Sequence, residues 1–246
     1  MLAREEIMAS TLDAATARYE ERLPSLENGD RLDQKTFHAR YEAMPHHVRA
    51  ELIGGIVYMP SPQKKPHGRS QQLLVRWLDE YEEATAGTES LSNTTSKLGT
   101  ESEPEPDGCL YVLPEYGGQT WEDAEQYLNG APELVGEISW ATESIDLHAK
   151  KDDYERAGVR EYIVVALRMK QVFWYVRRRG KFRELALGSD GLYRSENFPG
   201  LWLDPAALLR RDRKRLLAVL RQGLSSPEHA GFVDRLEKRR VSRGGR

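Results

Sequence analysis

Apolar residues recur along this chain with two different periods, which together predict a sheet covered by helices. Over residues 67–85 they recur every three or four positions, as in a long amphipathic helix packed on a sheet. Short apolar runs at 108–113, 134–140 and 162–167 predict buried strands instead. Both kinds of element therefore contribute to the core.

The order of these elements predicts how the strands are connected. Residues 145–157 read as a helix lying between the runs 134–140 and 162–167. A strand, a helix and a strand in this order fit a right-handed crossover between parallel strands. The runs 172–176 and 182–187 predict antiparallel continuations. The expected fold class is α/β (α+β), with a mixed central sheet flanked by helices.

The part before residue 131 gives more local predictions. Asp33 is the expected N-cap of a helix, and residues 50–59 read as a hairpin around a Gly54-Gly55 turn. Residues 88–100 are rich in Thr and Ser and predict one polar strand. Residues 114–131, with several glycines, predict a surface excursion.

The pattern divides the chain into three regions. Residues 1–32 look like a peripheral extension, with a helix at about 9–22. Residues 33–205 hold the main domain, and residues 206–246 form a basic, helical tail whose helix covers 206–220.

Composition narrows the class of protein. The 246 residues are 39% hydrophobic and 30% charged, and their formal net charge is −3. No apolar stretch approaches the roughly 20 residues that span a bilayer, and no signal peptide is visible, so we expect no membrane partner. Cys109 is the one cysteine, which rules out an intramolecular disulfide and favours the cytoplasm. Within its apolar run, Cys109 reads as a packed thiol.

The tail differs from the rest in charge. Residues 206–246 contain twelve Lys or Arg and four acids, a net of +8, so the remaining chain carries −11. This excess can bind nucleic-acid phosphates, or an acidic protein partner. Alternatively, the leucines of an amphipathic helix can pack on a neighbouring subunit of a homodimer while the arginines are solvated. These leucines are Leu208, Leu209, Leu216, Leu217 and Leu220.

The first candidate for a functional residue is a glutamate, Glu137, within a predicted buried strand. Glu137 lies inside an apolar run, where an unpaired charge is costly to bury, so it needs a partner. That partner is either a metal ion shared with Asp107, which precedes another apolar run, or an arginine in a buried salt bridge. Asp146, Lys150 and Tyr154 follow at intervals of four and share one helix face.

Several of these residues also have ordinary structural explanations. Asp146 and Lys150 can form a surface pair, and Tyr154 is more often a core residue than a catalytic one. His67 either faces solvent in the first turn of a helix or lies beside the site, and we favour the former. Ser139 lacks the context of a hydrolase nucleophile.

Short motifs occur in a definite order, each weak alone. The first two are Glu51-Leu52-Ile53-Gly54-Gly55 and Pro60-Ser61-Pro62, the latter followed by His67. Pro106-Asp107 comes next, and then Glu137-Ile138-Ser139, after which Thr142, Asp146, Lys150 and Tyr154 follow at regular spacing. The last motif is Gly158-Val159-x-Glu161-Tyr162.

In this order the motifs resemble the Uma family of restriction endonucleases, within the PD-(D/E)XK nuclease superfamily. The resemblance covers about residues 33–204 and implies a restriction-endonuclease-like fold. It implies that Asp107 and Glu137 are metal ligands and that Glu51 is a further acidic member. The lysine that the superfamily usually places two positions after the glutamate is replaced here by Ser139. Lys150 is the implied substitute, with Lys151 the next candidate.

The resulting hypothesis is a metal-dependent endonuclease that hydrolyses phosphodiester bonds, with DNA as the expected partner. Asp107, Glu137 and the carbonyl of Ile138 would hold Mg²⁺ or Mn²⁺, and Glu51 could bind a second ion or position the first. Lys150 would orient the attacking water or stabilise the developing charge. Two alternatives stay open: a catalytically inactive nuclease-fold module that binds nucleic acid, and an interaction protein whose tail docks to an acidic partner.

Overall fold

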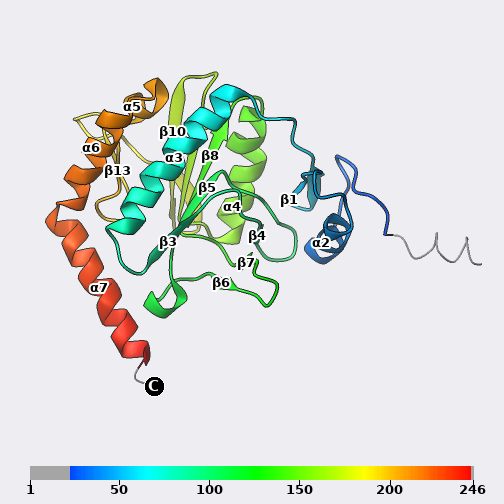
Figure 1. The fold of residues 1–246 in the computed structure, drawn as a ribbon, viewed down its shortest axis with the longest axis horizontal. Helices are drawn as coiled ribbons and strands as arrows, with labels where there is room; N and C mark the ends of the chain where they lie inside the picture. Colours follow the sequence, from blue (N-terminus) through cyan, green and yellow to red (C-terminus); the bar gives the residue numbers. More distant parts are fainter. Residues whose placement is uncertain (1–22, 245–246) are drawn as a thin grey trace, which may run out of the picture.

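A six-stranded mixed sheet forms the centre of the molecule (Figure 1). The computed structural model describes residues 23–244, so the helix expected at 9–22 lies outside the described part. The strand order is β11-β10-β9-β8-β5-β3; β8 and β9 are parallel, and the other neighbours are antiparallel. The expected mixed sheet and its crossover are confirmed. The strands are β3 (Thr88–Leu91), β5 (Gly108–Val112), β8 (Leu134–Ser139), β9 (Glu161–Ala166), β10 (Gln171–Arg178) and β11 (Lys181–Glu184).

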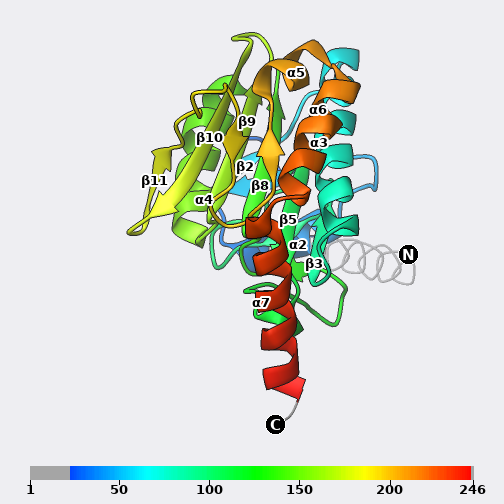
Figure 2. The same ribbon diagram turned by 90° about the vertical axis from the view of Figure 1, so that its left-hand side faces the viewer.

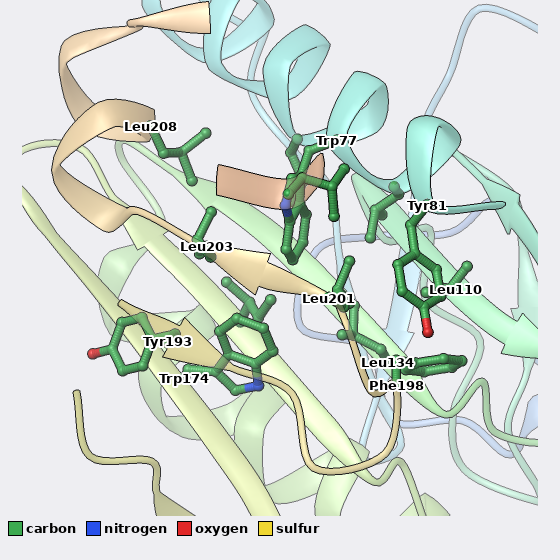
Figure 3. Close-up of a cluster of buried hydrophobic side chains, with 14 of the residues drawn as sticks. Trp77, Tyr81, Leu110, Leu134, Trp174, Tyr193, Phe198, Leu201, Leu203 and Leu208 are labelled. Carbon is green, nitrogen blue, oxygen red and sulfur yellow. The ribbon is translucent and has the colours of Figure 1, made fainter. Parts of the chain in front are cut away.

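The long amphipathic helix α3 (Lys65–Glu83) covers one face of the sheet, as its spacing predicts. Trp77 of α3 packs edge-on against Trp174 of β10, with 6.0 Å between ring centroids (Figure 3). Tyr81, one turn further along the helix, meets Phe198 in the same manner. These large side chains fix α3 over the centre of the sheet.

The opposite face is covered by the segment that connects β8 to β9. It begins with one π-helical stretch, η2 (Ile145–Lys150), and continues as α4 (Lys151–Ala157). Tyr154 of α4 packs against Tyr162 of β9, with ring centroids 5.0 Å apart. Gly158 ends α4 with φ of 98°, a left-handed conformation that favours glycine.

A small lobe lies beside α4, away from α3 (Figure 1). It contains α2 (Gln34–Glu42), which Asp33 caps through the Thr36 amide, and the expected hairpin of β1 (Glu51–Ile53) and β2 (Ile56–Tyr58). Its turn has positive φ at both glycines, as the favoured two-residue hairpin turn requires. Leu52 exchanges two backbone hydrogen bonds with Glu103, which ties the hairpin to the main body.

Two predictions before residue 131 need correction. Residues 88–100 form two strands rather than one, because the chain turns at Asn93, whose φ is 49°. Residues 114–131 are more structured than a simple excursion, since they supply most of a second, three-stranded sheet. Its strands are β4 (Ser96–Lys97), β7 (Leu128–Asn129) and β6 (Trp121–Glu122), and the short helix η1 (Pro114–Tyr116) precedes β6.

The tail contains three helices, so a single helix over 206–220 was wrong. Helix α5 (Pro205–Arg210) ends at Arg211, whose φ of 60° turns the chain, and Asp212 caps the following helix α6 (Arg213–Leu224). Helix α7 (Pro227–Gly244) then extends away from the other helices (Figure 2).

The leucines of the tail pack within this chain. Leu208, Leu216 and Leu220 are buried in the same core as α3, and Leu209 and Leu217 pack against it. A short two-stranded sheet, β12 (Tyr193–Arg194) with β13 (Trp202–Leu203), leads the chain into these helices. In the described part, no helix is long and apolar enough to cross a membrane.

This packing predicts that α6 is required for stability. Leu216 is fully buried, so Leu216→Ala should lower the free energy of unfolding by roughly 2–5 kcal/mol, the usual cost of such a cavity. Urea unfolding measures this. Leu187→Ala, at a leucine that is 48% exposed, should change it by no more than about 0.5 kcal/mol. Equal losses in both variants would contradict the packing.

Candidate active site

Asp107 and Glu137 lie at the same end of two neighbouring central strands. Strands β5 and β8 pair Cys109 with Val135 and Gly108 with Gly136, and one further step of this register sets Asp107 opposite Glu137. Side chains alternate along a strand, so both acids share the face on which Cys109 and Val135 contact α4. The two carboxylates that the sequence singles out therefore meet at one edge of the sheet.

Lys150 connects this edge with the small lobe. Its Nζ lies 2.9 Å from Oε1 of Glu137 and 2.9 Å from Oε1 of Glu51, and all three side chains are largely buried. Tyr154 also donates a hydrogen bond of 2.9 Å to Oε1 of Glu137. The partner of the buried glutamate is thus a lysine from the following helix and not the arginine considered for a buried salt bridge, because the crossover helix sets Lys150 over the end of β8.

Asp107 is held by the backbone of the neighbouring strand. Its Oδ2 accepts a hydrogen bond of 2.7 Å from the Ile138 amide, and Nε2 of His67 lies 3.2 Å from the same oxygen. The preference for a solvent-facing His67 was wrong, because the first turn of α3 lies over the start of β5 and only 9% of His67 is exposed. Nδ1 of His67 has no hydrogen-bond partner among the described residues.

Three other candidates, Ser139, Asp146 and Lys151, make no side-chain hydrogen bond or ion pair with Asp107, Glu137 or Lys150 among the described residues. Oγ of Ser139 is 3.4 Å from Oγ1 of Thr142, which donates a hydrogen bond of 2.6 Å to Asp146. These contacts fix the chain where β8 ends and η2 begins. Lys151, the alternative to Lys150, instead pairs with Asp152 at 3.3 Å and lies over the ring of Tyr175.

Burial and charge shift the proton affinities of the central groups. Burial raises the pKa of Glu137 to about 8; Lys150 opposes this shift, and Asp107, Asp146 and Glu51 add to it. Burial alone would lower the pKa of Lys150, but Glu137 and Glu51 raise it well above its ordinary value. Lys150 is therefore charged at neutral pH.

Cys109 lies on the same face as Asp107 but is a packed thiol, as its sequence context predicts. It is unpaired and 1% exposed, and burial raises its pKa to about 12. A neutral, inaccessible thiol is a poor nucleophile and a poor metal ligand.

The oxygens at this edge have the chemistry that a small, hard cation prefers. Within residues 23–244, no group of three or more His, Cys, Asp or Glu side chains is arranged to hold a metal. Mg²⁺ commonly uses only one or two carboxylates together with waters and substrate phosphates. Asp107 and Glu137 supply two, and the Ile138 carbonyl faces the same strand edge as its amide, because both groups of a strand residue point to one side. This donor set fits Mg²⁺ or Mn²⁺.

Comparison with known proteins shows the family of this chain. The Uma2 family model, described as "Putative restriction endonuclease", matches residues 36–206, well over half of the chain. The chain belongs to the Uma2 family. Among curated proteins, none matches the sequence significantly.

A solved structure supports the expected fold. It is described as the crystal structure of "a putative nuclease belonging to DUF820" from Anabaena variabilis ATCC 29413. The TM-score is 0.51 at 15% sequence identity, and the match covers 70% of this chain and 97% of that one. The restriction-endonuclease-like fold is therefore confirmed for this Uma2 protein, whereas the roles of its site residues remain predictions.

Sequence reasoning missed how Glu51 is positioned. Oε1 of Glu51 accepts a hydrogen bond of 2.8 Å from the Glu105 amide as well as that from Lys150. Glu105 lies 54 positions away along the chain, in the acidic loop before Asp107. No local pattern signals this contact, because it depends on the hairpin docking against that loop.

The raised pKa of Glu137 gives a testable dependence of stability on pH. Between its ordinary value of 4.5 and about 8, folded Glu137 keeps a proton that the unfolded chain releases. Stability from this group is therefore complete below pH 4.5 and is lost as the pH rises toward 8. In urea unfolding with EDTA, the wild type should lose more stability across this range than Glu137→Gln. An equal loss in both proteins would contradict the shift.

Proposed function

We propose that this Uma2 protein is a metal-dependent endonuclease that hydrolyses phosphodiester bonds in DNA, with Mg²⁺ or Mn²⁺ as the cofactor. The observation that carries the proposal is the meeting of Asp107, Glu137 and Lys150 at one edge of the central sheet. Two carboxylates and an ammonium group in this arrangement suit a metal-assisted attack on a phosphate.

The metal would be held by Asp107, Glu137 and the carbonyl of Ile138. In the described structure both hydrogen bonds to the Glu137 carboxylate reach Oε1, so Oε2 accepts none from the protein. Oδ1 of Asp107 is likewise not used by the Ile138 amide or by His67. When bound, the ion would polarise the phosphate and lower the pKa of a coordinated water.

Lys150 supplies the positive charge that the sequence lacks at Ser139. An ammonium group has three N–H donors, and two of them point to Glu137 and Glu51. The third is available for the attacking water or for a phosphate oxygen that gains charge during the reaction. Glu51 holds Lys150 in place and is itself fixed by the Glu105 amide.

His67 and Tyr154 complete this arrangement. Nε2 of His67 lies beside Asp107 at the start of α3, where it can donate to the carboxylate or to a nearby phosphate. Tyr154 is 1% exposed, so its hydroxyl positions Glu137 and does not act on substrate.

The same contacts also support the second candidate, an inactive nuclease-fold module that binds nucleic acid. Lys150 forms two ion pairs with buried carboxylates, which is the arrangement of a purely structural salt bridge. Ser139 in place of lysine is consistent with lost turnover. A module of this kind need not take up Mg²⁺, whereas the endonuclease must.

The direct test is an assay on supercoiled plasmid, single-stranded DNA and RNA, each with Mg²⁺, Mn²⁺ or EDTA. The proposal expects cleavage of DNA with either metal, none with EDTA, and none by Asp107→Asn, which removes a ligand charge. Binding without cleavage under every condition would favour the inactive module. Cleavage of RNA alone would keep the mechanism and reject the DNA substrate.

Substitution of Lys150 separates chemistry from metal binding. Lys150→Ala should reduce cleavage by about 10²–10³-fold or more, because it removes a donor that stabilises the transition state. Mg²⁺ affinity, measured by titration, should be nearly unchanged. Lys151→Ala is the matched control and should cleave like the wild type, because Lys151 pairs with Asp152 away from the site. Normal turnover by Lys150→Ala would assign the role elsewhere.

Mg²⁺ should also stabilise the folded protein. At tenfold excess over the dissociation constant, binding to the native state alone raises the free energy of unfolding by about 1.4 kcal/mol. Thermal unfolding with increasing Mg²⁺ or Mn²⁺ should show this increase for the wild type. Asp107→Asn should show a smaller one at equal concentration, and an unchanged wild-type melting temperature at millimolar ion would count against the site.

A further inference from the structure

A groove of about 650 Å³ opens beside the candidate active site. Its walls come from the first turns of α3, the residues that follow β8 and β9, and the bend between α5 and α6. Helix α5 and the start of α3 lie at the same end of the molecule (Figure 2). Its lining includes Arg69, Trp140, Lys170, Arg210 and Arg211.

Four exposed cations line this groove, and none of them is neutralised by an ion pair. Within the described residues, no carboxylate lies within 4.0 Å of Arg69, Lys170, Arg210 or Arg211. Asp204 feels the charge of Arg210 at longer range, but it is already paired with another arginine at 2.9 Å. Four cations around one groove form a strongly positive surface that favours an anionic ligand.

Trp140 adds an aromatic surface to this groove. It is partly exposed, and in the part of the chain described here its indole makes neither a hydrogen bond nor a ring contact. Trp77 and Trp174 behave differently, since each donates its indole N–H to an acceptor inside the core. A cationic groove with an unused aromatic ring suits a nucleic-acid strand with accessible bases.

The groove adjoins the candidate catalytic edge at two points of the backbone. Pro66, in its wall, precedes His67, which lies beside Asp107. Trp140 follows Ser139, which ends the strand that carries Glu137. A strand bound here would lie at the same end of the sheet as Asp107 and Glu137.

We propose that this groove binds a single nucleic-acid strand, with its phosphates on Arg69, Lys170, Arg210 and Arg211 and an unpaired base against Trp140. The proposal rests on the nuclease function proposed above and adds where the strand lies and in which form it is held. In a duplex the bases stack on one another, so their faces are not available to Trp140.

The cations of α7 cannot serve the same groove. Helix α7 packs against η1, which follows the end of β5, whereas Asp107 precedes the start of that strand. The side chain of Arg239 accordingly lies against Gly117, at the end of η1. The basic tail is therefore divided, with Arg210 and Arg211 beside the candidate site and the α7 cations at the other end of the sheet.

The test measures binding without cleavage, by fluorescence anisotropy of labelled single-stranded and duplex DNA in EDTA at increasing salt. Arg69→Ala/Arg210→Ala removes two exposed helical cations of the groove. Lys170 and Arg211 are kept, because their positive φ makes substitution a backbone change as well. The matched control is Lys238→Ala/Arg239→Ala, which removes the same charge from α7.

The groove variant should weaken single-strand binding and reduce the salt slope by about 1.4, at about 0.7 for each lost phosphate contact. The control should leave affinity and slope unchanged. Trp140→Ala should weaken single-strand binding about 5- to 10-fold, Trp140→Phe should restore most of it, and duplex binding should respond little. Thermal unfolding checks that each variant is folded.

Different failures overturn different claims. Loss of affinity in the α7 variant with none in the groove variant would reject the groove. Tighter binding of duplex than of single strands, unaffected by Trp140→Ala, would reject the role of Trp140 and the single-strand form. If wild-type protein binds no DNA or RNA at low salt, both the groove and the proposed nuclease function fail. If it binds through the groove but does not cleave with Mg²⁺, only the catalytic proposal fails.

Discussion

The contact on which the site depends is the buried hydrogen bond that Lys150 donates to the carboxyl group of Glu137. It joins the central strand β8 to the helix that crosses to β9, and through Glu51 it also joins the hairpin lobe. Glu137 and Glu51 contact this single ammonium group, and the charges of Asp107 and Asp146 also act on Glu137, so one positive charge cannot balance all of these acids. Burial, together with this excess of negative charge, raises the pKa of Glu137. A divalent cation between Asp107 and Glu137 would remove that excess of negative charge, which makes the site suited to a metal.

Much of the fold could be predicted from the sequence because its elements have strong, regular patterns. The crossover from β8 to β9 and the long helix α3 follow from apolar runs of clear period and length, and both appear as expected. Asp107 and Glu137 could be paired because they lie next to strands that turned out to be neighbours. Spacing by four residues placed Lys150 and Tyr154 on one face, and both contact Glu137.

The misjudged features depend on contacts between distant segments. His67 has the local sequence of a solvent-facing first turn, but α3 docks so that its ring lies beside Asp107. The single helix expected after Pro205 is broken at Arg211, whose φ of 60° is a left-handed conformation that an arginine in the sequence does not predict. The leucines of the tail seek an apolar surface, as their spacing indicates, and that surface is the core of the same chain. The net charge of the tail likewise could not reveal that its cations lie at two ends of the sheet.

The central claim is that Asp107 and Glu137 together hold a divalent ion while Lys150 stays within reach of it. The most direct measurement is anomalous diffraction from crystals of the protein soaked with Mn²⁺. The account predicts an anomalous peak bounded by Asp107, Glu137 and the Ile138 carbonyl, with the Lys150 ammonium group still beside this site. A structure without a peak there, in which Lys150 bridges Glu51 and Glu137 as before, would contradict it and leave this contact as a structural element alone.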